Sequence, residues 1–334
     1  MGDTSAGGAL VGTSLISGGI AFEVGPNQPD FTKAAGQDIE ATGSGTVLTL
    51  AAAAVNGNQA NQQLTLNFTD GTTATWTQSF SDWLTPQYYG NESFLSTQSY
   101  RNTASGGTND TTNYIYSYGY ALPEGKTLES ITLPNNADVR LLGAVLTAPQ
   151  TVDLTWGDWG IANGKTDVNH SDGFDGNGNY YYSGTDVVGD LPSPLVWGGV
   201  IFDYGPTSTT KDGTDNFVRA SGQEISITAG TFSSLCLAAA AANGSQTDQV
   251  FTLKFSDGSQ ETWTQSLSDW CGYEAFGGEA IASTQDYRVN KKGHTHEIKN
   301  YVYGYSYDIP AGKTLTSITL PDNSDVGILA MALV

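Results

Sequence analysis

Basic residues are scarce in this chain of 334 residues. Thirteen Lys and Arg stand against 34 Asp and Glu, which gives a formal net charge of −21. A surface this acidic repels the phosphate groups of nucleic acids and of anionic membranes. The composition therefore excludes nucleic acid as an expected partner.

Long apolar segments are also missing. No run of about 18 apolar residues occurs, so we expect no membrane insertion. The opening MGDTSA matches neither a signal peptide nor a myristoylation signal and is typical of a trimmed mature fragment. Little Lys together with much Asn and Thr is typical of secreted bacterial proteins. The expected location is extracellular.

A long internal repeat dominates what is present. Residues 50–146 align with residues 237–333 at a constant offset of 187 and without a gap, and roughly half of the positions are identical. Upstream, GGIAFEVGP (18–26) matches GGVIFDYGP (198–206) more weakly. A repeat of this length forms a complete domain, not one layer of a solenoid. We expect two copies, at residues 1–148 and 149–334.

Each copy has the pattern of an all-β domain. Turn signals recur about every 8 to 12 residues, which is typical of a β-sandwich. We predict two tandem sandwiches of jelly-roll-like type. In the hairpin around Asp70, a three-residue loop with Gly71 in the left-handed region places Trp76 on the same face as Leu64.

Four tyrosines alternate along one strand of each copy and therefore share one face. In the first interpretation these rings cover the core between the sheets, and in the second they form a platform on which sugars stack. The rows are Tyr114, Tyr116, Tyr118 and Tyr120, matched by Tyr301, Tyr303, Tyr305 and Tyr307.

The repeated motifs resemble a known bacterial domain. They include Asn56-Gly57, Asp70-Gly71-Thr72, TQSFSDW, Tyr100-Arg101 and SITLPNN. Together they resemble an ancillary domain found beside catalytic modules in secreted hydrolases, glycosidases among them. The resemblance implies a β-sandwich with a carbohydrate-associated accessory role and no activity of its own.

Three charged residues recur in both copies: Asp82, Glu92 and Arg101, matched by Asp269, Glu279 and Arg288. Two carboxylates could form an acid and base pair that cleaves glycosides. The alternative is a structural pairing in which a buried arginine ties loops to the sheet. We favour the structural interpretation and expect no enzyme, because no nucleophile motif or metal triad accompanies these residues.

The two cysteines have no counterparts in the first copy. Cys236 and Cys271 correspond to Thr49 and Leu84, so the copies share no disulfide framework. The sequence allows either one disulfide within the second copy or two free thiols.

Aromatic residues outside the shared core are candidates for binding a saccharide, because flat sugar faces stack on exposed rings. Each could instead contribute to packing. The candidates are Tyr88, Tyr89, Trp156, Trp159, Tyr180, Tyr182, Trp197 and Tyr273.

A loop special to the second copy offers closely spaced oxygen atoms, which Ca²⁺ prefers as ligands. A plain polar turn is the alternative, since the bidentate Glu of a calcium loop is missing. The residues are Asp172, Asp175, Asn177 and Asn179.

The copies differ at their beginnings. Only residues 1–9 precede the equivalent strand of copy one, so we expect it to lack a strand that the segment 152–182 supplies in copy two. A sandwich with a missing strand captures one from elsewhere, and head-to-tail capture builds filaments. The leading function is a carbohydrate-binding accessory module, and the alternative is a structural or adhesive subunit that self-associates.

Overall fold

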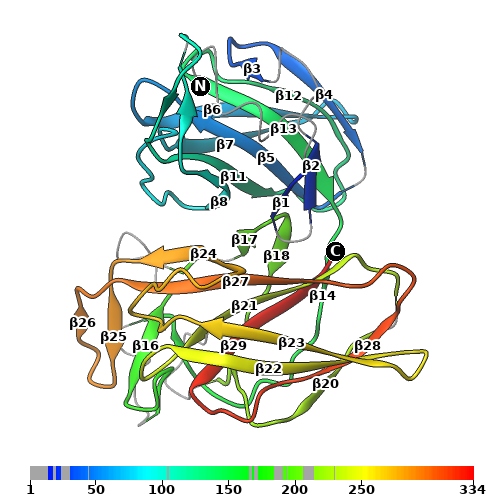
Figure 1. Ribbon diagram of the computed structural model, residues 1–334, viewed down its shortest axis with the longest axis vertical. Coiled ribbons are helices and arrows are strands. Elements are labelled where there is room, and N and C mark those ends of the chain that lie inside the picture. The colour runs from blue at the N-terminus through cyan, green and yellow to red at the C-terminus, as the bar shows by residue number, and fades with distance from the viewer. Residues whose placement is uncertain are drawn as a thin grey trace. The chain divides into compact units, whose positions relative to one another are not determined.

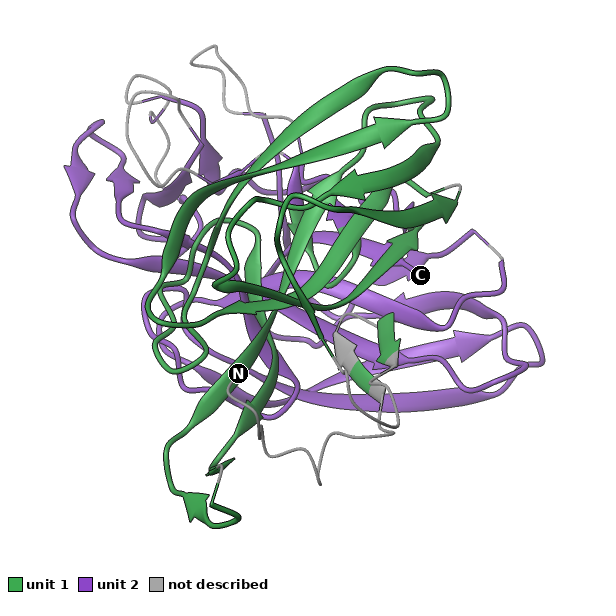
Figure 2. Ribbon diagram, turned by 90° about the horizontal axis from the view of Figure 1, so that it is seen from above, with its two compact units in different colours: residues 1–149, 196–200 green, residues 150–195, 201–334 purple. Residues whose placement is uncertain are grey.

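The computed structural model describes residues 14–17, 20–23, 31–43, 45–103, 105–164, 168, 172–183, 191–192, 194–205, 214–228 and 230–334. The chain divides into two compact units, coloured separately in Figure 2. Unit 1 comprises residues 1–149 with 196–200, and unit 2 comprises residues 150–195 with 201–334. The described residues contain strands and no helix, so the prediction of an all-β fold is confirmed.

Unit 1 is a sandwich of two antiparallel sheets (Figure 1). One sheet has the strand order β3-β13-β5-β11-β8, and the other has the order β4-β12-β6-β7. The first sheet comprises β3 (Thr32–Lys33), β13 (Val139–Thr147), β5 (Val47–Ala54), β11 (Asn113–Ala121) and β8 (Glu92–Gln98). The second comprises β4 (Asp38–Gly43), β12 (Leu128–Thr132), β6 (Gln59–Phe68) and β7 (Thr73–Phe80).

Unit 2 repeats this arrangement (Figure 1). Its larger sheet has the order β14-β29-β21-β27-β24, with β19 also on β29, and its smaller sheet has the order β20-β28-β22-β23. The larger sheet comprises β14 (Gln150–Thr151), β29 (Val326–Leu333), β21 (Ser234–Ala241), β27 (Asn300–Asp308), β24 (Glu279–Gln285) and β19 (Val218–Arg219). The smaller comprises β20 (Glu224–Ser226), β28 (Leu315–Thr319), β22 (Gln246–Phe255) and β23 (Gln260–Leu267).

Short strands complete the units. Hairpins pair β1 with β2, β9 with β10 and β17 with β18, and a small sheet of unit 2 has the order β15-β16-β25-β26. The hairpin strands are β1 (Ser14–Ser17), β2 (Ile20–Glu23), β9 (Arg101–Asn102), β10 (Thr108–Asn109), β17 (Leu195–Trp197) and β18 (Val200–Phe202). The small sheet comprises β15 (Ile161–Ala162), β16 (Asn179–Tyr182), β25 (Arg288–Asn290) and β26 (Thr295–His296).

The hairpin of β6 and β7 has the predicted three-residue loop. The Phe68 backbone N donates to the Thr72 carbonyl oxygen at 3.0 Å, and Gly71 adopts a φ of +79°. Leu64 and Trp76 are register partners, so they share the face that packs into the core. The predicted three-residue loop, with Leu64 and Trp76 on one face, is confirmed.

The tyrosine rows face the space between the two sheets, as the first interpretation expected. Tyr116 and Tyr118 of β11 are buried in the core with Leu50, Leu66 and Trp76. Burial of an aromatic ring removes its face from contact with a ligand. The middle tyrosines of both rows therefore belong to the core, and the outer ones are partly buried beside them; the buried ones are Tyr116, Tyr118, Tyr303 and Tyr305.

Candidate functional site

Glu92 lies buried where β7 ends. Its Oε1 accepts hydrogen bonds from Ser81 Oγ at 2.8 Å and from the Tyr88 backbone N at 3.1 Å. Its Oε2 accepts hydrogen bonds from Tyr118 Oη at 2.9 Å and from the Ser81 backbone N at 3.3 Å. Burial outweighs these hydrogen bonds and raises the pKa of the carboxyl to about 7. The group fastens the loop after β7 to the core strand β11.

The equivalent carboxylate of unit 2 keeps three of these four hydrogen bonds. Glu279 accepts hydrogen bonds from Ser268 Oγ at 2.6 Å, from the Ser268 backbone N at 2.8 Å and from Tyr305 Oη at 2.7 Å. Asp82 likewise accepts hydrogen bonds from backbone N–H groups on both sides, those of residues 57 and 84, at 2.8 and 2.9 Å. These contacts support the structural interpretation of the repeated carboxylates.

The repeated arginines do not pair with carboxylates, so that part of the prediction is wrong. The Arg101 guanidinium lies over the Trp83 ring at 5.3 Å, and the Arg288 guanidinium lies over the Trp270 ring at 5.5 Å. Among the described residues, neither arginine has a carboxylate within ion-pair distance. The reason is that backbone N–H groups already occupy the nearby Asp82, which leaves the aromatic face as the partner.

The cysteines are free thiols. Cys236 is buried, and Cys271 is partly buried with its Sγ 3.6 Å from Arg288 Nη1. Burial raises the pKa of the Cys271 thiol to about 11. A thiol held protonated at neutral pH is a poor nucleophile and a poor metal ligand, so neither cysteine marks a reactive site.

A cleft opens in unit 1 beside the stacked Arg101 and Trp83. Its volume is about 650 Å³, within the range of small-ligand sites. Both apolar surface and hydrogen-bonding groups line it. We call it the unit 1 cleft, and its lining residues are Val55, Asn56, Gly57, Asp82, Trp83, Leu84, Thr85, Arg101 and Arg140.

Unit 2 fills the same place with its own chain. Phe174, from the segment special to the second copy, packs against the Trp270 ring at 5.2 Å and the Phe217 ring at 5.1 Å. Tyr181 lies against Trp270 at 5.0 Å. Gly327 makes this possible, because a Cβ there would lie 2.5 Å from a Phe174 ring carbon.

Unit 1 has Arg140 where unit 2 has Gly327. The strand registers show this equivalence, since Arg140 pairs with Lys33 as Gly327 pairs with Arg219. The Arg140 guanidinium lies over the Phe31 ring at 5.6 Å, whereas Phe174 packs on the equivalent phenylalanine in unit 2. An arginine therefore occupies the place that a phenylalanine ring takes in the other unit.

The segment 152–182 belongs to unit 2, where β16 pairs with β25. In unit 1 the equivalent strand β9 pairs only with β10 among the described residues. The expected difference between the copies is therefore present in this part of the chain. Residues 1–13, which the expectation about copy one also concerned, lie outside the described residues.

Four of the eight aromatic candidates are buried, which corrects the prediction for Trp159, Tyr180, Tyr182 and Trp197. The Trp159 and Tyr180 rings contact each other at 4.9 Å, and Trp159 Nε1 donates to the Ile161 carbonyl oxygen at 3.0 Å. A small second core forms here, so the rings of its members are not available to a sugar.

The other four candidates keep some exposure. Tyr88 is 43% exposed, whereas Tyr89, Trp156 and Tyr273 are partly buried. The Tyr88 ring meets Phe94 edge to face at 5.7 Å, which leaves part of its surface to solvent. Saccharide binding by these four residues stays a prediction.

The candidate calcium loop closes on its own hydrogen bonds. Asp175 Oδ1 accepts from the backbone N of Asn177 at 2.9 Å and of Asn179 at 3.1 Å. Asp175 Oδ2 accepts from Asn179 Nδ2 at 2.7 Å. Asp172 is exposed, and among the described residues no three His, Cys, Asp or Glu gather as a metal cluster. The arrangement fits the polar turn, and calcium stays a prediction.

The cleft was not predicted from the sequence. Asn56 and Arg140, both on its wall, were not among the candidates. The alignment of the two copies contains a signal for the cleft, because Arg140 is aligned with Gly327 within a well-matched strand. Separately, no helix among the described residues is long and apolar enough to cross a membrane.

The chain was compared with known proteins, solved structures and family models. A search of curated proteins finds no match. Among solved structures, the tandem CBM22-1–CBM22-2 domain of Xyn10C from Paenibacillus barcinonensis matches 97% of this chain and 98% of its own, with 10% identity and a TM-score of 0.20. A structure of oxalate decarboxylase matches 87% of this chain and 67% of its own, with 8% identity and a TM-score of 0.14.

The model of one family covers the whole length of the repeat. The AziU2-like beta-sandwich domain matches residues 2–151 and again residues 148–334. These matches coincide with the duplication that the sequence shows and with the two sandwiches of the fold. The chain therefore belongs to the family of AziU2-like beta-sandwich domains and contains two adjacent copies.

Proposed function

We propose that the chain is a non-catalytic extracellular accessory module that binds carbohydrate in the unit 1 cleft. The observation that carries this proposal is an open cleft of about 650 Å³ at a place that the sister unit fills with its own aromatic side chains. A site shaped to receive part of a polypeptide in one copy is free to receive a ligand in the other.

The lining of the cleft suits a saccharide. The side chains of Asn56, Thr85 and Arg101 bring an amide, a hydroxyl and a guanidinium to its wall. These groups hydrogen-bond sugar hydroxyls, and the apolar surface of Val55 and Leu84 suits the C–H faces of a sugar ring. Tyr88, in the loop that precedes the buried Glu92 of β8, adds an exposed ring in this unit.

The hydrogen bonds of the two carboxylates support a non-catalytic role. The oxygens of Asp82 and Glu92 accept hydrogen bonds from backbone N–H groups and hydroxyls. A general acid or base must instead reach the substrate with its proton. The proposal is therefore binding in which no bond is broken.

Calorimetric titration against a panel of polysaccharides tests the proposal. Thr85→Trp fills the cleft, and Gly272→Trp makes the same change at the equivalent turn of unit 2 as a control. We expect binding with one site per chain, lost in the Thr85 variant and kept in the Gly272 variant. Binding that survives Thr85→Trp, or no binding to any polysaccharide, would overturn the proposal.

The alternative function is a structural or adhesive subunit that accepts a strand from another molecule. The motivating observation is that, within the described part of the chain, β9 has no counterpart of the strand β16 that pairs with β25 in unit 2. Arg140 argues against this alternative. A ring placed like Phe174 leaves no room for a side chain at Gly327, and unit 1 has Arg140 at the equivalent position. Light scattering across concentrations separates the two functions, since only the alternative predicts growing assemblies.

A further inference from the structure

We propose that the unit 1 cleft selects saccharides that carry a carboxylate, such as those containing a uronic acid, through Arg140 and Arg101. This inference rests on the proposed function and adds the charge of the ligand to it. Four observations lead to it, beginning with the state of Arg140.

Arg140 is buried, and two of its three guanidinium nitrogens lack a hydrogen-bond acceptor among the described residues. The residue is 8% exposed, and among the described residues its Nε and Nη1 have no acceptor. A buried guanidinium normally binds carboxylate or carbonyl oxygens, because an unpaired charge away from water is strongly unfavourable. The Phe31 ring stabilises the flat face of the guanidinium, but it provides no acceptor for the N–H groups of Nε and Nη1.

The comparison with unit 2 shows that this charge is an addition. In unit 2 the same place holds the apolar contact of Phe174 with Phe217 and Gly327. The fold of the domain therefore does not need a cation at this point. A cation that the fold does not need, in the wall of an open cleft, points to a ligand that supplies the opposite charge.

The carboxylate on the cleft wall does not supply it. Asp82 directs Oδ2 to the Gly57 backbone N and Oδ1 to the Leu84 backbone N. Arg101, the other cation of the wall, lies over Trp83 and likewise has no carboxylate partner among the described residues. Two guanidiniums without acid partners thus line one cleft.

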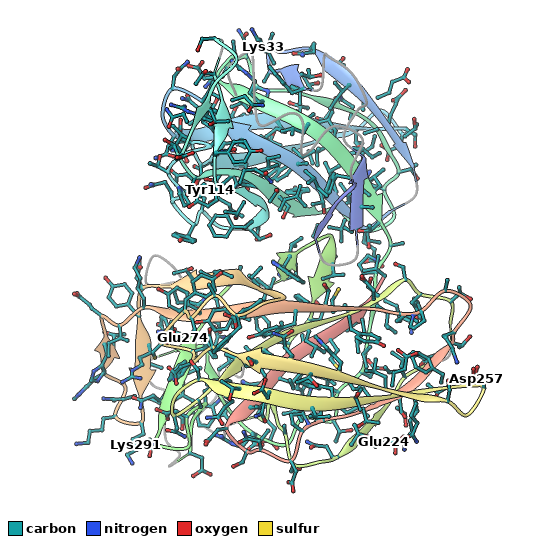
Figure 3. The ribbon with its side chains drawn as sticks, viewed as in Figure 1. Lys33, Tyr114, Glu224, Asp257, Glu274 and Lys291 are labelled. Carbon is teal, nitrogen blue, oxygen red and sulfur yellow. The ribbon has the colours of Figure 1, made fainter. Side chains whose placement is uncertain are left out.

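Half of the basic residues of unit 1 lie at the cleft. Residues 1–149 contain four basic residues, Lys33, Arg101, Lys126 and Arg140, and two of them line the cleft. Lys126 pairs with Asp70 at 2.5 Å. Lys33 lies on the edge strand β3 (Figure 3) as the register partner of Arg140, but it does not line the cleft. The cleft is therefore a local basic site on an acidic domain, and screening over about 8 Å limits repulsion from the surrounding carboxylates.

The chemistry of the ligand follows from the geometry of guanidinium. Arginine binds a carboxylate through two parallel N–H donors, which gives both strength and orientation. The sugar ring that carries the carboxylate then contacts Asn56 and Thr85 at the wall of the cleft. A neutral sugar would keep the contacts with Asn56 and Thr85 and lose the hydrogen bonds between a carboxylate and the arginines.

Titration of the whole chain with trigalacturonate and with its carboxyl-reduced neutral form tests the inference. Arg140→Gly introduces the residue that unit 2 already has there, and Lys33→Met removes a neighbouring charge as the control. Hydrogen bonds to charged groups are worth about 1.5–3 kcal/mol. We therefore expect Arg140→Gly to weaken trigalacturonate binding at least about tenfold and to change neutral trisaccharide binding less than about twofold.

The outcomes separate the inference from the function beneath it. Equal affinity for the acidic and neutral trisaccharides, or acidic binding unchanged by Arg140→Gly, refutes the inference and leaves carbohydrate binding standing. Failure of every saccharide to bind refutes both. Equal binding of a short peptide through its C-terminal carboxylate refutes the choice of saccharide. If Arg140→Gly does not fold, Arg140→Lys keeps the charge without the two-pronged donor and should still weaken acidic binding.

Discussion

Glu92 makes the stability of unit 1 depend on pH. Burial raises the pKa of this carboxyl from an ordinary value of 4.5 to about 7 in the folded chain. The folded state therefore holds a proton that the unfolded state has released at intermediate pH. The resulting stabilisation is fully present below pH 4.5 and is lost as the pH rises through about 7.

The magnitude follows from the two pKa values. Each pKa unit corresponds to about 1.4 kcal/mol, so the change from 4.5 to about 7 amounts to about 3 kcal/mol. We expect the unfolding free energy of unit 1 to fall by about this amount between pH 4.5 and pH 8. Urea unfolding followed by tryptophan fluorescence across this range measures it.

Replacement of Glu92 by Gln separates this effect from the other carboxylates. The variant cannot titrate at this position, so the decrease of stability toward pH 8 should shrink by about 3 kcal/mol. It should also be less stable than the parent at pH 5, because an amide N–H₂ would face the N–H donors of Ser81 or Tyr88. Glu124→Gln, at an exposed turn, is the control. An unchanged pH profile in Glu92→Gln would refute the reasoning.

Three further predictions concern unit 2. Phe174→Ala should destabilise it by about 3–5 kcal/mol in calorimetry, because the ring is fully buried among other rings. Arg288→Ala should cost only about 1 kcal/mol, as expected for stacking on Trp270, whereas a loss of about 3–5 kcal/mol would indicate a buried ion pair after all. Calcium should not raise the melting temperature above that in EDTA, because both oxygens of Asp175 already accept hydrogen bonds; a clear increase would identify a calcium site.

The sandwich could be predicted because its signals are local and duplicated. The alternation around Asp70 placed Leu64 and Trp76 on one face, and the register of β6 and β7 has them as partners. The tyrosine rows followed from the same two-residue period. Period and turn chemistry act over a few residues, so the sequence contains them directly.

The site could be predicted much less well, because its properties depend on contacts between distant segments. Tyr180 and Tyr182 lie in a short strand that is covered on both faces, and no alternation warns of this. The partner of Arg101 was misjudged because Asp82 is already used by backbone N–H groups, which only the folded loop shows. The cleft lies where the segment of unit 2 that contains Phe174 has no counterpart among the described residues of unit 1.

The packing of Phe174 against Trp270 has a consequence for how duplicated domains acquire a task. A segment of the same chain that occupies a cleft acts as a tethered competitor, present at a very high effective concentration. Under the proposed function, an outside ligand would have to displace this segment before it could bind unit 2, so only unit 1 is expected to bind. Lengthening the tether, or exchanging Phe174 for a smaller residue, would lower this competition and is expected to open the equivalent place in unit 2. In such a pair, one copy is free to change its ligand while the other preserves the fold.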